Sequence, residues 1–126
     1  SGSLGADELC KASGLSQDEL SELESYGVIS PDTVAGDDTY DDTALEIATV
    51  SKRFLDSGVE ARHLRGWRVA ADREVGLLEQ LIQPLLRQRN PAARAEAVDR
   101  LTALEQDGGK LRAAMMKSAL RHHTAR

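Results

Sequence analysis

Apolar residues in the second half of the chain recur at alternating steps of four and three, and this spacing limits the possible folds more than any other feature. The first run comprises Ala71, Val75, Leu78, Ile82 and Leu85. The second run comprises Ala97, Leu101, Leu104, Gly108, Leu111 and Met115. Steps of four and three keep side chains on one helix face, so the spacing predicts two long helices with apolar seams. The dipeptide Asn90-Pro91 marks the second helix start, with asparagine capping and proline in the first turn.

Two interruptions lie within these helical runs. Pro84 lacks a backbone N–H, which predicts a kink or a break near Leu81. Gly108 and Gly109 each weaken the last helix by about 1 kcal/mol relative to alanine. The glycine pair therefore predicts either a hinge or a close approach between helices.

Glycines and capping residues divide the first half into shorter elements. A helix is predicted at about 6–12, ended by Gly14, and a second begins at Ser16 and is ended by Gly27. The segment Ser16-Gln17-Asp18-Glu19 has the pattern of a capping box, which satisfies two free backbone amides. Two short helices joined by a tight turn predict a helix-turn-helix.

The middle of the chain predicts a small β-hairpin, or wing. An extended segment at 28–31 and a returning strand at 39–40 flank a polar loop at 32–38. Helices are expected to follow at about 42–57 and 61–72. The predicted fold class is therefore mainly α: a winged helix-turn-helix with a two-stranded wing, followed by long C-terminal helices that form a hairpin or a dimerisation arm.

Composition agrees with a helical fold. Aromatic residues make up only 3% of the chain, so the core must consist of leucine, isoleucine, valine and alanine. We expect residues 1–3 to be a cloning scar, 4–74 to form the winged helix-turn-helix and 75–126 the helical dimerisation and regulatory region. The absence of an initiator methionine favours an excised domain.

Charge is distributed unequally between the two halves. Residues 1–50 carry twelve acidic side chains and one basic side chain, whereas residues 51–126 carry fifteen basic and nine acidic ones. Such asymmetry indicates a partner, a contact between the halves or a solvated acidic surface.

Several segments of the chain resemble the MerR family of bacterial transcription regulators. They are Glu8–Ser16, Leu20, Leu23–Pro31, Tyr40–Asp42 and Phe54–Val59. The resemblance covers about residues 7–85. It implies a winged helix-turn-helix and a dimer that is built by long helices after the winged module.

The DNA-reading surface of that family is not kept. MerR proteins read DNA with the second helix and contact phosphates with basic residues. The corresponding positions here are acidic: Asp18, Glu19, Glu22, Glu24, Asp37 and Asp38. Carboxylates repel phosphates, and phosphate contacts require cations. The chain is therefore similar to the degenerate C-terminal module of actinobacterial regulators with two MerR-like modules, in which the N-terminal module binds DNA.

The resulting hypothesis is a dimerisation and regulatory domain that senses an effector or a partner. Alternatives are a domain that itself binds promoter DNA as a MerR-type winged helix, or one that binds a small effector. We expect a homodimer whose interface comprises Val75, Leu78, Ile82, Leu85, Leu101, Leu104, Leu111 and Met115. An intramolecular hairpin would use the same residues.

Two further surfaces are candidate sites. Tyr40 and Trp67 could line a pocket for an aromatic or cationic effector, although Trp67 could instead pack inward. The acidic second helix could dock a protein of the transcription machinery through Asp18, Glu19, Glu22 and Glu24.

No motif in the sequence supports catalysis or a cofactor. No nucleophile elbow, phosphate-binding loop or zinc-protease motif occurs, so we expect no enzyme activity, no catalytic residue and no cofactor. Cys10 is the single cysteine, which argues against a thiolate metal site and favours a buried structural role. One thiol, no signal peptide and no long apolar stretch predict a cytoplasmic protein without a membrane partner.

Overall fold

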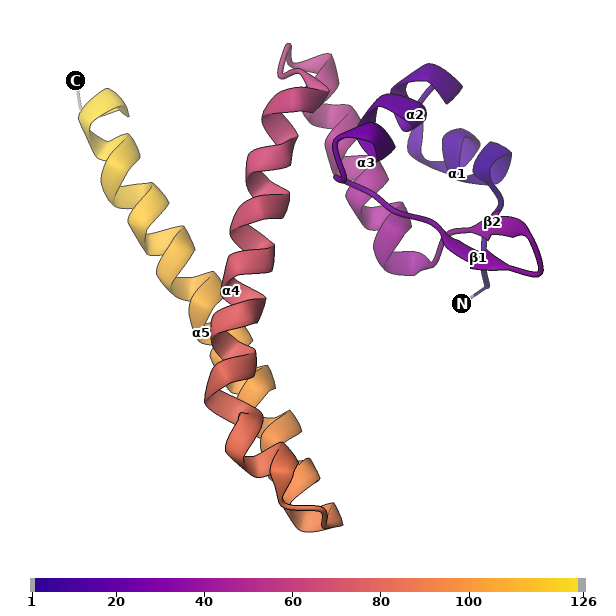
Figure 1. Ribbon diagram of the computed structural model, residues 1–126. Coiled ribbons are helices and arrows are strands. Elements are labelled where there is room, and N and C mark those ends of the chain that lie inside the picture. The colour runs from indigo at the N-terminus through magenta and orange to yellow at the C-terminus, as the bar shows by residue number, and fades with distance from the viewer. Residues whose placement is uncertain (1, 125–126) are drawn as a thin grey trace. The chain divides into compact units, whose positions relative to one another are not determined.

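The computed structural model describes residues 2–124 (Figure 1). In chain order the elements are α1 (Ala6–Ser13), α2 (Gln17–Ser25), β1 (Asp32–Val34), β2 (Asp37–Thr39), α3 (Asp42–Asp56), α4 (Ala61–Arg87) and α5 (Pro91–Thr124). They confirm the predicted mainly helical class, the small antiparallel hairpin and the long C-terminal helices. The chain forms two compact units, which divide between Asp72 and Arg73.

The start of α2 has the predicted capping box. The Ser16 hydroxyl accepts from the Glu19 N–H at 3.0 Å, and the Glu19 carboxylate accepts from the Ser16 N–H at 2.9 Å. Gly27 follows the helix with φ +72°, a conformation that favours glycine. These local signals fix both ends of α2 as the sequence predicted.

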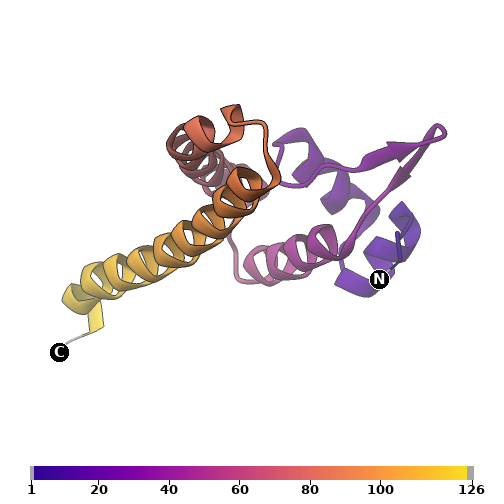
Figure 2. The ribbon, with the colours of Figure 1, turned by 90° about the horizontal axis from the view of Figure 1, so that it is seen from below.

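The hairpin lies a few residues further along the chain than predicted. Asp32 pairs with Thr39 and Val34 with Asp37, on either side of a two-residue turn whose Ala35 and Gly36 both have positive φ. This turn places the strands inside the segment that we expected to be a loop. Figure 2 shows the hairpin projecting beyond α1, α2 and α3.

The predicted first strand at 28–31 is instead part of the core. Val28 and Ile29 are 7% and 1% exposed, so this part of the segment belongs to the core that precedes the hairpin. The other side chains buried in this core are Leu9, Leu15, Leu20, Leu23, Tyr40, Ala44, Ala48, Ala61 and Leu64. Leucine and alanine dominate, as the low aromatic content predicted.

Tyr40 joins three parts of the first unit. Its backbone exchanges two hydrogen bonds of 2.8 Å with Leu4, so the N-terminal segment pairs with the end of the hairpin. Asp41 follows it and caps α3, accepting from the Ala44 N–H at 2.8 Å. The cap confirms the predicted start of α3.

We predicted that helix α4 ends at about Asp72, but it continues to Arg87. No helix-breaking residue follows Asp72 directly, so nothing in the local sequence stops the helix there. The helix also continues through Pro84, so of the kink or break predicted near Leu81 the break does not occur. Proline deprives the carbonyl of Gln80 of its helical partner, but Gln80 is exposed, so water can satisfy that carbonyl.

The second unit is an antiparallel hairpin of two helices, the end of α4 and all of α5. Asn90 caps α5 as predicted, accepting from the Ala93 N–H at 2.8 Å. Leu78 and Ile82 of α4 and Ala93 and Ala97 of α5 are buried in this hairpin. The packed pair of helices accounts for a large part of the predicted apolar seams.

The glycine pair in α5 marks a close approach rather than a break. The helix continues through both residues. A Cβ added to Gly108 would lie 3.1 Å from Oε1 of Glu74, whereas one added to Gly109 would meet nothing within 4 Å. Glu74 also receives a hydrogen bond of 2.7 Å from Arg112, one turn after Gly108. Gly108 therefore makes room for the Glu74–Arg112 ion pair.

None of the helices described between residues 2 and 124 is long and apolar enough to cross a membrane.

Candidate functional site

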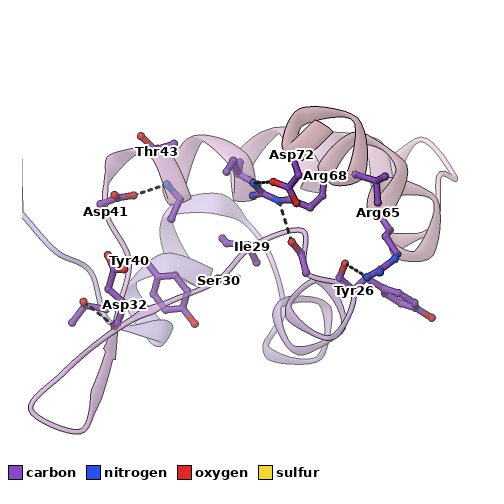
Figure 3. Close-up of a pocket in the computed structure, with 15 residues that line it drawn as sticks. Tyr26, Ile29, Ser30, Asp32, Tyr40, Asp41, Thr43, Arg65, Arg68 and Asp72 are labelled. Carbon is purple, nitrogen blue, oxygen red and sulfur yellow. Dashed lines mark hydrogen bonds and ion pairs between the residues drawn. The ribbon is translucent and has the colours of Figure 1, made fainter. Parts of the chain in front are cut away.

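A pocket of the first unit lies beside the hairpin and has a volume of about 530 Å³ (Figure 3). We call it the wing pocket. It is lined by Tyr26, Gly27, Ile29, Ser30, Asp32, Thr39, Tyr40, Asp41, Thr43, Ala44, Ile47, Arg65, Arg68, Val69 and Asp72. Its volume is within the range of small-molecule sites. Of these residues, Tyr40 was predicted to line an effector pocket.

Two arginines of α4 form one end of the wing pocket. Arg68 donates to the carbonyls of Gly27 at 3.1 Å and Val28 at 2.9 Å, and Arg65 donates to the carbonyl of Tyr26 at 3.2 Å. These carbonyls follow the C-terminal end of α2, where cations are favourable. The guanidinium groups therefore hold α4 against this loop. Three of their N–H donors are used in these hydrogen bonds to backbone carbonyls.

The opposite end of the wing pocket is formed by the hairpin and the start of α3. Asp32 and Asp41 bring carboxylates there, and Ser30 and Thr43 bring hydroxyl groups. Asp41 uses Oδ1 to cap α3. Among residues 2–124, the Asp32 carboxylate has no hydrogen bond or ion pair, so it remains available to a ligand.

The ring of Tyr40 lines the wing pocket, but its hydroxyl group is not free to bind a ligand. Its side chain is 2% exposed, and its hydroxyl donates to Oε2 of Glu24 at 2.5 Å. Burial, and then the nearby Glu24 carboxylate, raise the pKa of Tyr40 well above its ordinary value. The hydroxyl therefore stays protonated and holds α2 against the end of the hairpin.

Trp67 lies in a separate, smaller and more apolar groove of about 300 Å³. The prediction that Trp67 packs inward is wrong, because its side chain is 55% exposed; Leu64 occupies the core position of α4. Trp67 instead rests on Phe54, with ring centroids 5.2 Å apart. Tyr40 lines the wing pocket only, so the structure does not bring Tyr40 and Trp67 into one effector pocket.

Two of the four carboxylates predicted to form a docking surface on α2 are engaged within the domain. Glu19 pairs with Lys52 at 3.1 Å, and Glu24 accepts from Tyr40. The backbone N–H of Ser16, and then Lys52, lower the pKa of Glu19 despite its partial burial. Asp18 and Glu22 are exposed.

The residues predicted to form the dimer interface fall into three groups. Leu78 and Ile82 are buried within the helical hairpin. The half-buried group is Leu85, Leu101 and Leu104. The exposed group is Val75, Leu111 and Met115, at 51%, 57% and 61%. Only this last group is fully available to another molecule.

Helix α5 carries further exposed apolar residues that the heptad spacing missed. Met116 and Leu120 are 52% and 48% exposed, and every residue from Lys110 to Thr124 is exposed. They lie outside the strict four-three steps, so the sequence signal for them was the general apolar character of the segment. The same segment, 108–124, contains four basic residues and no acidic residue.

No group of three or more histidine, cysteine, aspartate or glutamate side chains in residues 2–124 has an arrangement that could hold a metal ion. Cys10 is half-buried against the core of the first unit. Burial, and then nearby Asp7, raise the pKa of its thiol, which disfavours the reactive thiolate.

Comparison with known proteins finds matches over nearly the whole chain. A family model described as Rv1828-like, C-terminal domain, matches residues 2–124. Two similar proteins are the uncharacterized HTH-type transcriptional regulators Rv1828 of Mycobacterium tuberculosis and Mb1859 of Mycobacterium bovis, each 31% identical over 118 residues. The match covers 94% of this chain but 47% of each relative, so the chain spans about half their length.

Proposed function

Because the chain belongs to the family of Rv1828-like C-terminal domains, we propose that it is the dimerisation and regulatory domain of a MerR-type transcription regulator. In this proposal it acts in the cytoplasm, and DNA is read by a separate N-terminal module. The relatives are named HTH-type transcriptional regulators, and about half of their length lies outside the match. That other half has room for a DNA-binding module.

The observation that carries the dimerisation proposal is the exposed apolar surface of α5. Leu111, Met115, Met116 and Leu120 are between 48% and 61% exposed. The segment from Gly109 to Thr124 spans about 24 Å at 1.5 Å per residue. A helix of this length is marginal in water without packing against a neighbour. A second molecule that covers this apolar surface would supply the missing contact.

A second copy of the chain suits this surface better than an unrelated partner. In a twofold arrangement the same residues meet each other, so an apolar stripe is its own complement. The helical periodicity places Lys110, Lys117 and Arg121 together at the edge of the apolar arc, and it places Arg112 between Met115 and Met116. Arg112 is paired with Glu74 of the same chain at 2.7 Å, so the charge that falls within the arc already has a partner.

The oligomeric state tests this proposal. Light scattering at tens of micromolar is expected to report a dimer for the parent chain and a monomer for Met115→Asp. Burial of one such side chain is worth about 1.5–3 kcal/mol, and it occurs twice in a twofold dimer. The dissociation constant should therefore rise at least about 100-fold.

Val34→Asp is the matched control, because Val34 is 60% exposed, almost as much as Met115, but lies on the hairpin. It is expected to leave the dimer intact. A monomeric parent chain would overturn the proposal. A Met115→Asp variant that still dimerises would exclude α5 as the interface.

The acidic surface of the first unit supports DNA reading by another module. Helix α2 has no lysine or arginine between Gln17 and Ser25, and the hairpin carries Asp32, Asp37 and Asp38. Fluorescence anisotropy with a mixed-sequence duplex at low salt is expected to show no binding by this chain. Tight binding that weakens steeply with salt would instead favour a DNA-binding domain.

A further inference from the structure

We propose that the wing pocket binds a small organic amine in its protonated form, with the ammonium group beside Asp32 and Asp41. This inference rests on the regulatory role proposed above and names the chemistry of the effector. It depends on three properties of the pocket: the charges at each end, the partners that those charges already have, and the apolar surface between the ends.

The hairpin end of the pocket suits an ammonium group. The Asp32 carboxylate has no partner within residues 2–124, and Asp41 uses only Oδ1 in capping α3. An ammonium group has three donors and no acceptor, so carboxylate oxygens are suitable partners for it. The field of the whole unit acts in the same direction, because residues 1–72 carry fifteen acidic and six basic side chains.

The arginine end of the pocket does not suit an anion. Arg68 directs Nε and Nη2 at the carbonyls of Gly27 and Val28, and Arg65 is bound to the carbonyl of Tyr26. An anion would have to compete with these bonds. Asp72 lies 3.9 Å from Arg68 at this end and offsets one of the two positive charges. The remaining positive charge repels a second cation, so a monoamine should bind better than a diamine.

Between the two ends the pocket offers apolar surface. Ile47 and Val69 are half-buried and supply this surface, whereas Ile29 and Tyr40, 1% and 2% exposed, lie beneath it, and the Tyr40 hydroxyl is already bound to Glu24. This surface suits an aliphatic body attached to the ammonium group. The ligand class is therefore a monovalent amine with an apolar chain.

An NMR titration with n-hexylamine as the probe tests the proposal. We expect saturable amide shifts at the residues that line the wing pocket, and binding at least about tenfold weaker for 1-hexanol, hexanoate and 1,6-diaminohexane. Asp32→Asn and Asp41→Asn should each weaken hexylamine binding about tenfold. Asparagine is also a good N-cap, so Asp41→Asn keeps the start of α3.

Asp37→Asn is the matched control, because it removes the same charge from the same hairpin at a residue that does not line the pocket. It should leave hexylamine binding unchanged. Equal affinity for hexanol and hexylamine would overturn the proposal, as would shifts confined to the exposed carboxylates of α2. Unchanged binding by both Asp32→Asn and Asp41→Asn would overturn it too.

The same titration on Met115→Asp separates this inference from the dimerisation proposal. All residues of the wing pocket belong to the first unit, so the variant should bind hexylamine like the parent chain. Binding by a parent chain that light scattering shows to be monomeric would support the amine site and reject dimerisation. A dimer that fails to bind hexylamine would reject the amine site alone.

Discussion

Replacement of the two adjacent glycines of α5 by alanine tests the close approach between the helices of the second unit. Alanine is favoured over glycine in a helix interior by about 0.8–1 kcal/mol. At Gly109 an added Cβ meets nothing within 4 Å, so Gly109→Ala should gain this amount in full. The corresponding rise in melting temperature is about 3–6 °C for a chain of this size.

At Gly108 the same gain is opposed by Glu74. The added Cβ would lie 3.1 Å from Glu74 Oε1 and 3.3 Å from its Cδ, so the carboxylate must move away. That movement disturbs the 2.7 Å ion pair with Arg112, whose side chain is 60% exposed. Such pairs contribute about 0.2–1 kcal/mol. Gly108→Ala should therefore change stability by between about −0.2 and about +0.8 kcal/mol, less than Gly109→Ala.

Urea unfolding followed by helical circular dichroism at one fixed protein concentration measures both variants. Repeating Gly108→Ala in a Glu74→Ala background closes a double-mutant cycle, and there the full alanine gain should return. Equal stabilisation by Gly108→Ala and Gly109→Ala with Glu74 present would refute the close approach. Destabilisation by both variants would indicate a hinge in place of a continuous helix.

Substitutions at four other residues probe the first unit. Tyr40→Phe should lower the free energy of unfolding by about 1–3 kcal/mol at neutral pH, because Glu24 loses a buried donor. Because the pKa of Tyr40 is raised in the folded chain, above about pH 10 the unfolded chain loses the hydroxyl proton first. The parent chain should therefore lose stability as the pH rises, and Tyr40→Phe should lose less. Urea unfolding between about pH 8 and pH 11 checks this. Ser16→Ala should cost about 1 kcal/mol through loss of the α2 cap, and Ser16→Asn should restore most of it in the same measurement. Arg68→Met should cost about 2 kcal/mol or more in thermal unfolding because two carbonyls lose a charged donor, whereas Arg65→Met, with one exposed bond, should cost less than about 1 kcal/mol.

The local features of the fold could be read from the sequence because their causes are local. The capping residues Ser16, Asp41 and Asn90 act on amides two or three residues away, so each helix start was predicted correctly. The hairpin was displaced because a positive φ at Ala35 is not expected of alanine, and the turn was therefore not recognised. The break at Pro84 was wrong because exposure of the preceding turn cannot be read from spacing.

The candidate sites depended on packing between distant segments, which the sequence pattern does not specify. Arg65 and Arg68 bond to carbonyls about forty residues earlier in the chain, so no local motif announces the wing pocket. The acidic character of α2 is evident from the sequence. The contacts of Glu19 with Lys52 and of Glu24 with Tyr40 could be identified only from the folded structure. The heptad seams could not distinguish the residues used within the hairpin from those left exposed.

The distribution of buried residues along α5 also has a consequence for motion. Ala93 and Ala97, near the turn at Asn90, are buried, whereas every residue from Lys110 to Thr124 is exposed. In an isolated copy, backbone amides near the turn should therefore exchange with deuterium slowly, and those in the last four turns should exchange almost as fast as in a free peptide. Opening would then spread inward from the C-terminal end, and any molecule that covers this end would slow the exchange of the whole helix.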